Sequence, residues 1–105
     1  MLTQNAAIDI VKNYAREIQK AGVNLRKVIL FGSFANGTQH EWSDIDVALV
    51  ADDFIGVSFI DKDKFPYIGI KYPYYLIETK TYPTDYFEES DPFIEEIKKT
   101  GIEIH

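Results

Sequence analysis

An amphipathic repeat at the start of the chain predicts a helix over residues 3–21. Its apolar positions recur at three- and four-residue spacing, which gathers them on one helical face. Thr3 or Asn5 offers a side chain that can cap the first turn, and Gly22 follows as a stop signal. The residues expected to be buried are Ile8, Val11, Tyr14, Ala15 and Ile18.

A second helix is predicted near the end of the chain. Asp91 precedes Pro92, the order of an N-cap followed by proline at the first helical position. Glutamates occupy the first turn and lysines the last, which suits the helix dipole, and Gly101 ends the helix. Its buried stripe is expected to consist of Phe93, Ile94 and Ile97.

Three apolar runs predict strands. Residues 28–31 and 45–50 are short, nearly continuous apolar runs, which are typical of strands covered on both faces. Residues 74–82 are dense in Tyr, Ile and Thr and lie between Pro73 and Pro83, which bound them as a third strand. These runs predict a small sheet backed by helices.

The connection between the second and third runs is the least defined part of the pattern. Apolar residues within 54–60 fit either a short helix or a partly packed loop, and residues 67–72 fit a brief extra strand. The whole pattern predicts one α/β (α+β) domain over residues 1–105. Its expected architecture is a small mixed sheet of three to five strands flanked by helices.

Composition narrows the class of protein. The chain has 105 residues, of which 46% are hydrophobic and 27% charged, as in soluble globular domains. No apolar run approaches the ~20 residues of a membrane helix, so no membrane partner is expected. The charged residues among the first twenty argue against a signal peptide. The lack of cysteine excludes disulfides and thiol chemistry. The expected location is the cytoplasm.

Charge narrows the choice of ligand. Seventeen acidic residues against eleven basic ones give a net charge of −6. Nucleic-acid binding depends on basic faces that neutralise phosphates, so nucleic acid is not expected as the primary substrate. The balance instead suits a small substrate delivered with a cation, or a basic protein partner.

The chemistry of the chain is concentrated in residues 28–50. Gly32-Ser33 follows the first strand, and ten residues later Asp44-Ile45-Asp46 opens the second. Alternate residues of a strand point the same way, so the carboxylates of Asp44 and Asp46 are expected to project together. Paired carboxylates repel unless a cation compensates them or their pKa values shift. Hard oxygen ligands indicate Mg²⁺ or Mn²⁺.

The Gly32-Ser33 corner supplies the complementary half of such a site. Glycine lets the backbone approach a ligand closely, and serine offers N–H and O–H donors to an anion. A short helix capped by Ser33 and ended by Gly37 is expected next. Phosphate donors facing metal-binding carboxylates suit phosphoryl and nucleotidyl transfer. On its own, the spacing of the Ser-Asp-Ile-Asp segment would also fit a capped strand entry.

Together these residues resemble the minimal nucleotidyltransferases of the DNA polymerase β-like superfamily, whose signature is Gly-Ser, about ten residues, then Asp-x-Asp. The resemblance implies a nucleotidyltransferase fold that moves a nucleoside monophosphate, AMP from ATP, to an acceptor hydroxyl. It implies that Gly32 and Ser33 hold the β- and γ-phosphates. It also implies that Asp44 and Asp46 bind Mg²⁺, with two ions expected in the site and Mn²⁺ as a substitute.

The resemblance further implies a third catalytic carboxylate, which binds the second Mg²⁺ and helps to deprotonate the acceptor. Glu78 is the candidate because it is the one acidic residue within 74–82. In the alternative, Glu78 pairs with Lys71 or Lys80 on a solvent face. The acidic residues assigned to loop solubility are Asp52, Asp53, Asp61 and Asp63.

The resemblance also implies a partner. Proteins of this kind are commonly encoded beside a small, all-helical HEPN-type ribonuclease toxin and act as its antitoxin, in some cases by attaching AMP to it. Six of the seven tyrosines fall within twenty residues, which suits an interface, although strands favour tyrosine as well. Three alternatives remain open: a non-catalytic antitoxin, a homo-oligomer, and a transferase acting on small molecules. His40 and Trp42 are further candidates for contact with the nucleotide.

Overall fold

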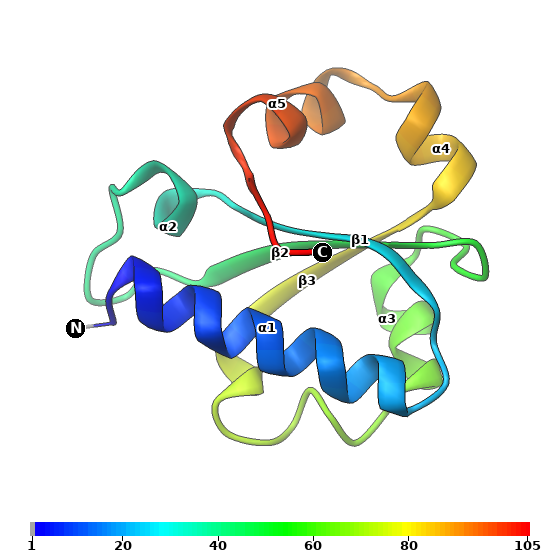
Figure 1. The fold of residues 1–105 in the computed structure, drawn as a ribbon, viewed down its shortest axis with the longest axis horizontal. Coiled ribbons are helices and arrows are strands. Elements are labelled where there is room, and N and C mark those ends of the chain that lie inside the picture. The colour runs from blue at the N-terminus through cyan, green and yellow to red at the C-terminus, as the bar shows by residue number, and fades with distance from the viewer. Residues whose placement is uncertain (1) are drawn as a thin grey trace.

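A computed structural model describes residues 2–105 (Figure 1). The first half of the chain forms α1 (Gln4–Lys20), β1 (Leu25–Phe31), α2 (Ser33–Asn36) and β2 (Ile45–Ala51). The crossover that follows contains α3 (Ser58–Asp61) and the 3₁₀ turns η1 (Lys62–Lys64) and η2 (Tyr74–Leu76). The remaining elements are β3 (Ile77–Pro83), α4 (Thr84–Glu89), α5 (Pro92–Thr100) and β4 (Ile102–Glu103).

The strands form one mixed sheet in the order β3-β2-β1-β4. β1 runs antiparallel to both β2 and β4, whereas β2 and β3 are parallel. Parallel neighbours require a long crossover, and the segment between β2 and β3 supplies it. The small mixed sheet flanked by helices that the sequence predicts is thereby confirmed.

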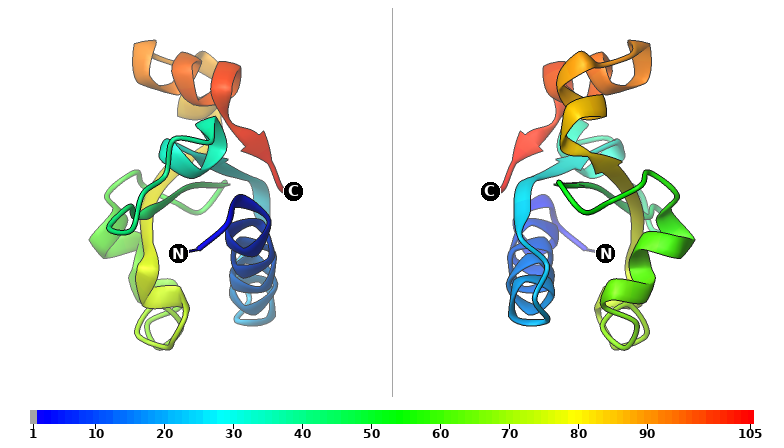
Figure 2. Two further views of the ribbon diagram at one scale, coloured as in Figure 1. Left: turned by 90° about the vertical axis from the view of Figure 1, so that its left-hand side faces the viewer. Right: turned by 90° about the vertical axis from the view of Figure 1, so that its right-hand side faces the viewer.

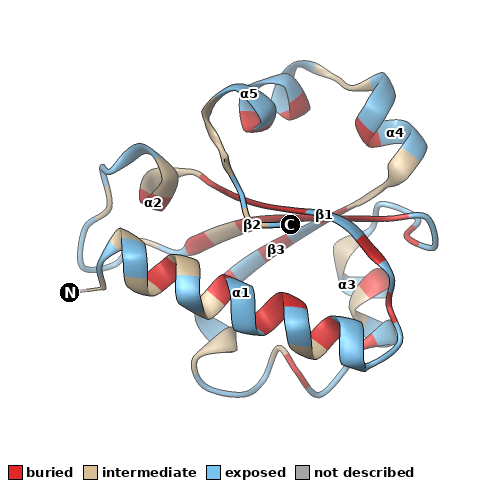
Figure 3. Cartoon of the chain, viewed as in Figure 1, coloured by how far each residue is buried: buried red, intermediate tan, exposed pale blue. Residues whose placement is uncertain are grey.

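Helices cover both faces of the sheet. α1 lies across one face, and α4 and α5 lie over the other, as the two side views show (Figure 2). Burial follows this layering, because the strands and the inner side of α1 carry most of the buried positions (Figure 3). Within residues 2–105, no helix combines the length and the apolar character that crossing a membrane requires.

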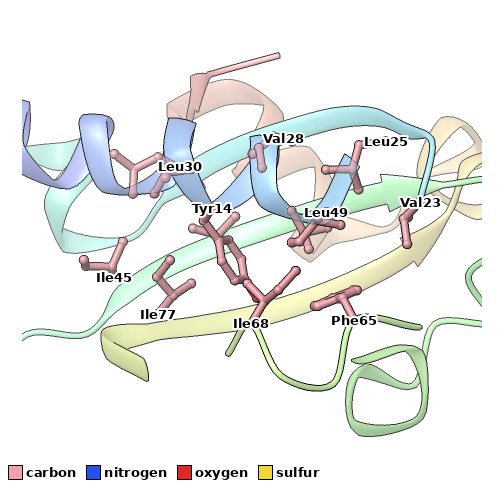
Figure 4. Close-up of a cluster of buried hydrophobic side chains, with 14 of the residues drawn as sticks. Tyr14, Val23, Leu25, Val28, Leu30, Ile45, Leu49, Phe65, Ile68 and Ile77 are labelled. Carbon is pink, nitrogen blue, oxygen red and sulfur yellow. The ribbon is translucent and has the colours of Figure 1, made fainter. Parts of the chain in front are cut away.

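The larger core lies between α1 and the sheet (Figure 4). Side chains alternate along a strand, so every second residue of β1 and β2 faces α1. Most of the stripe predicted for α1 is buried here, with Ala7 included and Ile8 only partly covered. The strand residues of this core include Val28, Leu30, Ile45, Val47, Leu49 and Ile77.

The smaller core lies on the opposite face. Phe87 of α4 and the pair Ile94 and Ile97 of α5 pack over the sheet. The strand residues beneath them are Ile29, Phe31, Ala48 and Val50. Phe93 differs from the prediction, because it is 47% exposed and meets Phe31 edge-on at a centroid distance of 5.8 Å.

Both predicted long helices are confirmed, with the caps that the sequence indicates. The Thr3 hydroxyl accepts a hydrogen bond from the Ala6 N–H at 3.1 Å. The Asp91 carboxylate accepts one from the Ile94 N–H at 2.7 Å at the start of α5. Each cap satisfies a backbone donor that the first helical turn leaves free.

The third strand begins later than predicted. The backbone at 74–76 forms a 3₁₀ turn, in which the Leu76 N–H donates to the Pro73 carbonyl at 3.0 Å. The extra strand predicted for 67–72 is wrong, since that stretch consists of turns. Of the two interpretations left open for residues 54–60, the short helix is present, as α3 over Ser58–Asp61.

Polar side chains join β3 to the rest of the larger core. The hydroxyls of Thr79 and Tyr14 lie 2.8 Å apart, both buried, and share a hydrogen bond. The Thr81 hydroxyl donates to the Asp61 carboxylate at 2.6 Å. Burial is the first cause that raises the pKa of Tyr14, and its hydrogen bond to Thr79 opposes the rise. These bonds hold the inner face of β3 against α1 and α3.

The structure shows that the sequence prediction for Asp61, a role in loop solubility, is wrong. Only 1% of it is exposed, and its carboxylate accepts hydrogen bonds from the Ile55 N–H at 2.9 Å and the Gly56 N–H at 3.0 Å. A buried carboxylate persists only when hydrogen bonds compensate for the lost water. Asp52 is exposed in a turn, as expected, and in addition pairs with Arg26 at 2.7 Å.

Candidate active site

Asp46 stands at the beginning of β2, on the face that α5 covers. Its neighbours Ile45 and Val47 are buried towards α1, so strand alternation turns Asp46 to the other side. Asp46 is half-buried, and Asp44, just before the strand, is exposed. The sequence prediction that an acidic pair opens this strand is consistent with these positions.

Gly32 lies directly against the carboxylate of Asp46. Phe31 is the β1 partner of Asp46, so Gly32 follows at the same end of the sheet. A Cβ atom built on Gly32 would collide with Oδ2 of Asp46 and would lie 3.2 Å from its Cγ. Gly32 also has φ 75° and ψ −153°, a conformation that only glycine adopts readily. The corner and the acidic residue therefore meet, as the spacing predicted.

The helix that follows the corner differs in one detail from the prediction. Ser33 is the first residue of α2, and Gly32 holds the N-cap position without a side-chain cap. Gly37 ends α2 in the left-handed conformation with φ 75°, as expected. Ser33 therefore does not cap the helix, and its hydroxyl is not committed to that role.

Gln4 holds α2 in place from α1. Its Nε2 donates to the Phe34 carbonyl at 2.8 Å and to the Ala35 carbonyl at 3.3 Å. These carbonyls lie at the end of a short helix, where backbone acceptors have no helical partner. Nothing in the linear pattern around Gln4 signals this contact, which spans thirty residues of sequence.

Glu78 is the neighbour of Asp46 on the parallel strand β3. Paired residues on adjacent strands point to the same face, so Glu78 joins Asp46 on the side of α5. Glu78 is exposed, and Lys80 follows on the same face with its Nζ 5.6 Å from the centroid of the Phe93 ring.

Electrostatics links these side chains. Burial is the first cause that raises the pKa of Asp46, and the negative charges of Asp44 and Glu78 raise it further. The positive charge of Lys80 opposes the rise. The sequence prediction did not include Lys80 in the site, although its two-residue spacing from Glu78 along a strand was the available signal.

The ion pairs of the structure test the alternative in which Glu78 pairs with Lys71 or Lys80 on a solvent face. Lys71 pairs with Glu17 at 3.5 Å, and none of the ion pairs formed within residues 2–105 includes Glu78. The solvent-face pairing that the sequence left open is therefore not observed in the part of the chain that the structure describes.

Asp44 and Asp46 are the residues that could hold a divalent cation. Among residues 2–105, no three His, Asp or Glu side chains gather closely enough to hold a metal by themselves. Mg²⁺ in nucleotide sites is typically bound by one or two carboxylates together with the substrate phosphates. Asp44 and Asp46 supply such oxygens, and burial first, then the negative charges of Asp44 and Glu78, raise the pKa of Asp46. Glu78 as a third ligand stays a prediction.

Comparison with known proteins identifies the family. The model of the nucleotidyltransferase domain family matches residues 8–104 of the chain. The chain belongs to this family. The match takes in the corner, the acidic pair and Glu78, and the family assignment at this level agrees with the resemblance seen in the sequence.

A solved structure supports the fold of this nucleotidyltransferase domain. A toxin–antitoxin complex with AMP-PNP contains a chain that aligns with a TM-score of 0.59 and 21% sequence identity. The alignment covers 90% of this chain and 72% of that chain. The expected nucleotidyltransferase fold is thereby confirmed. No curated protein shows a significant match to the nucleotidyltransferase domain described here.

Proposed function

We propose that this nucleotidyltransferase domain transfers AMP from ATP, with Mg²⁺, to a hydroxyl group on a protein partner. The observation that carries the proposal is the contact between the Gly32 corner and the carboxylate of Asp46, with the charges of Asp44 and Glu78 acting on it. Backbone donors and acidic side chains thus lie together where a triphosphate and its cation would bind.

Gly32 and Ser33 would bind the β- and γ-phosphates through their backbone N–H groups and the Ser33 hydroxyl. Gly32 has no side chain, so the triphosphate can approach the backbone beside Asp46. Asp44 and Asp46 would hold Mg²⁺, which neutralises phosphate charge and orients the α-phosphate for in-line attack. Positioning and charge neutralisation are the main requirements of this chemistry.

Glu78 would take the proton of the acceptor hydroxyl. It stands beside Asp46 but is more exposed, so an acceptor can reach it from solvent. In the transfer step, the acceptor oxygen forms a bond to the α-phosphorus and the bond to the β-phosphate oxygen breaks. The hydroxyl proton passes to Glu78, and pyrophosphate leaves.

A HEPN-type helical toxin is the proposed partner, with this chain as its antitoxin. Two features support a protein partner: the similarity in fold to a toxin–antitoxin complex, and apolar side chains exposed on the crossover. The exposed side chains are Ile55, Phe59, Tyr67, Ile70, Tyr72 and Tyr75, each more than half exposed. The same surface favours a second candidate function, in which the chain neutralises its partner by binding alone.

The test measures AMP transfer from ATP labelled at the α-phosphate to a co-purified HEPN-type protein. Asp44→Asn and Asp46→Asn should each lower the transfer rate by at least about 100-fold, because each removes a charge from the cation site. Asp53→Asn is the matched control, since Asp53 is an exposed acidic residue outside the site, and it should transfer normally.

The same variants separate the two candidate functions. Transfer that survives both site substitutions would refute the proposed roles of Asp44 and Asp46. The Asp46→Asn variant is expected to transfer almost no AMP. If it still suppresses the ribonuclease activity of the toxin at equal complex concentration, the antitoxin acts by binding alone. If suppression is lost together with transfer, the covalent modification is the antitoxin function.

A further inference from the structure

The loop between α2 and β2 presents an exposed tryptophan beside the acidic pair. Trp42 is the single tryptophan of the chain, and 82% of it is exposed. It precedes Asp44 by two residues, so the two Cα atoms lie within about 7 Å of each other. A large aromatic side chain left in water next to a nucleotide site is a candidate contact for the base.

Hydrogen bonds within the loop fix the backbone that carries this side chain. The Ser43 N–H donates to the His40 carbonyl at 3.0 Å, and the His40 N–H donates to the Ser43 hydroxyl at 2.9 Å. The Trp42 N–H donates to Nδ1 of His40 at 3.2 Å. These bonds favour one conformation of the turn, and a preorganised loop lowers the entropic cost of binding.

The same bonds distinguish His40 from Trp42. The His40 ring accepts a hydrogen bond from the loop backbone, so it acts as a positioning group for the turn. The Trp42 side chain remains exposed. Of the two residues that the sequence left as nucleotide contacts, the structure favours Trp42.

Other exposed aromatic residues lie in the crossover that precedes β3. Tyr72 and Tyr75 contact each other with ring centroids 5.7 Å apart, and Tyr75 precedes Glu78 by three residues. Glu78 is the residue assigned to the acceptor in the proposed function. Trp42 instead precedes Asp44, a residue assigned to the cation and its nucleotide, by two positions.

We infer that Trp42 is a stacking platform for the nucleobase of the bound nucleoside triphosphate; this inference rests on the proposed function. Stacking on an aromatic ring is favourable for every base, because each base has a π-face. Trp42 would therefore increase affinity for nucleotides over free polyphosphate. It would not select strongly among the four bases.

Fluorescence of the single tryptophan provides the test. Excitation of the wild-type protein at the red edge of its absorption, where tryptophan dominates, reports on Trp42 alone because the chain has one tryptophan. With Mg²⁺ present, ATP and the other three nucleoside triphosphates should change its emission, whereas inorganic tripolyphosphate should leave it unchanged. N-acetyltryptophanamide titrated with the same ligands corrects for absorption by the nucleotides.

Calorimetry on matched variants provides the second measurement. Trp42→Leu should weaken ATP binding by about 5- to 150-fold and leave tripolyphosphate binding unchanged. Trp42→Phe keeps an aromatic face and should retain most of the affinity. Because Trp42 is 82% exposed, neither substitution is expected to disturb the fold, and circular dichroism checks this.

The outcomes separate this inference from the proposed function. If ATP binds the wild type and Trp42→Leu equally, the platform is refuted while the nucleotide site stands. If ATP and tripolyphosphate both fail to bind the wild type, the nucleotide site itself is refuted and the platform with it. Emission that changes equally with ATP and tripolyphosphate would also refute stacking.

Discussion

The two faces of the sheet differ in what they contribute. The face under α1 carries the larger apolar cluster, which extends over β1, β2 and β3. The face under α4 and α5 carries a smaller cluster, and its far end holds Asp46 and Glu78 in place of apolar residues. One face thus supplies most of the stability, and this allows the other to keep charged side chains together.

Strand alternation makes this division possible within a few residues. Along β2, Ile45 and Val47 face α1, while Asp46 and Ala48 face α5. A shift of one residue in strand register would turn the acidic residue into the core. The apolar face therefore also determines where the Asp46 carboxylate points.

The largest effect expected from this comparison concerns matched isoleucines on the two faces. Ile18 of α1 and Ile97 of α5 are 0% and 2% exposed. Ile18→Ala should lower the free energy of unfolding by about 3–5 kcal/mol, and Ile97→Ala by about 2–3 kcal/mol, since the smaller cluster relaxes more easily around a cavity. Urea denaturation measures both. Equal costs would contradict the division of labour between the faces.

The next effect concerns the buried carboxylate of Asp61. Asp61→Ala leaves the Ile55 and Gly56 N–H groups and the Thr81 hydroxyl without their acceptor. The free energy of unfolding should fall by about 2–4 kcal/mol, because buried donors without partners are costly. Asp63→Ala, at an exposed position on η1, is the control and should change stability by less than about 0.5 kcal/mol. Similar values for the two variants would refute the role of Asp61.

Two glycines with the same φ allow the contact between Gly32 and Asp46 to be tested separately from backbone strain. Gly32 and Gly37 both have φ 75°, but only at Gly32 would a Cβ atom meet Asp46; at Gly37 the space is open. Gly37→Ala should lower the free energy of unfolding by about 1 kcal/mol because of backbone strain. The variant should bind MgATP normally. Gly32→Ala should cost about 1–3 kcal/mol and also weaken MgATP binding at least about 10-fold. Normal MgATP binding by Gly32→Ala would show that the contact does not matter for the site.

The smallest expected effect is the gain in stability when Asp46 is replaced by asparagine. Its folded-state pKa is raised, so the ionised carboxylate opposes folding when the pH exceeds that pKa. Asp46→Asn should raise the free energy of unfolding at pH 7 by less than about 1 kcal/mol. The gain should shrink as the pH falls through the raised folded-state pKa and should vanish below about 4, the ordinary pKa of the carboxyl in the unfolded chain. A gain that is the same at pH 3 and pH 7 would contradict this explanation.

Much of the fold could be predicted because local signals and tertiary packing agree. The stripe on α1, the proline after Asp91 and the apolar runs of β1 and β2 each indicate an element that the structure contains. The start of β3 was misplaced, because the tyrosines at 74 and 75 have high strand propensity yet follow Pro73 into a 3₁₀ turn. Tertiary contacts decided that boundary.

The site was predictable where sequence neighbours also meet in space. Gly32 and Asp46 lie on one β1–α2–β2 unit and meet in the structure, and Asp44 acts on Asp46 through its charge. Gln4 and Asp61 act through contacts distant in sequence, with no local pattern to reveal them. Asp61 in particular resembles any loop aspartate until the backbone donors around it are known.

The parallel pairing of β2 with β3 has a consequence for synthesis on the ribosome. The chain emerges from its N-terminus, so α1, β1 and β2 leave the exit tunnel before β3 does. Until then the buried Tyr14 hydroxyl lacks its Thr79 partner, and part of the apolar face of β2 is uncovered. A nascent chain arrested before β3 would carry Asp46 without Glu78, and its open sheet edge would make it a target for chaperones and proteases.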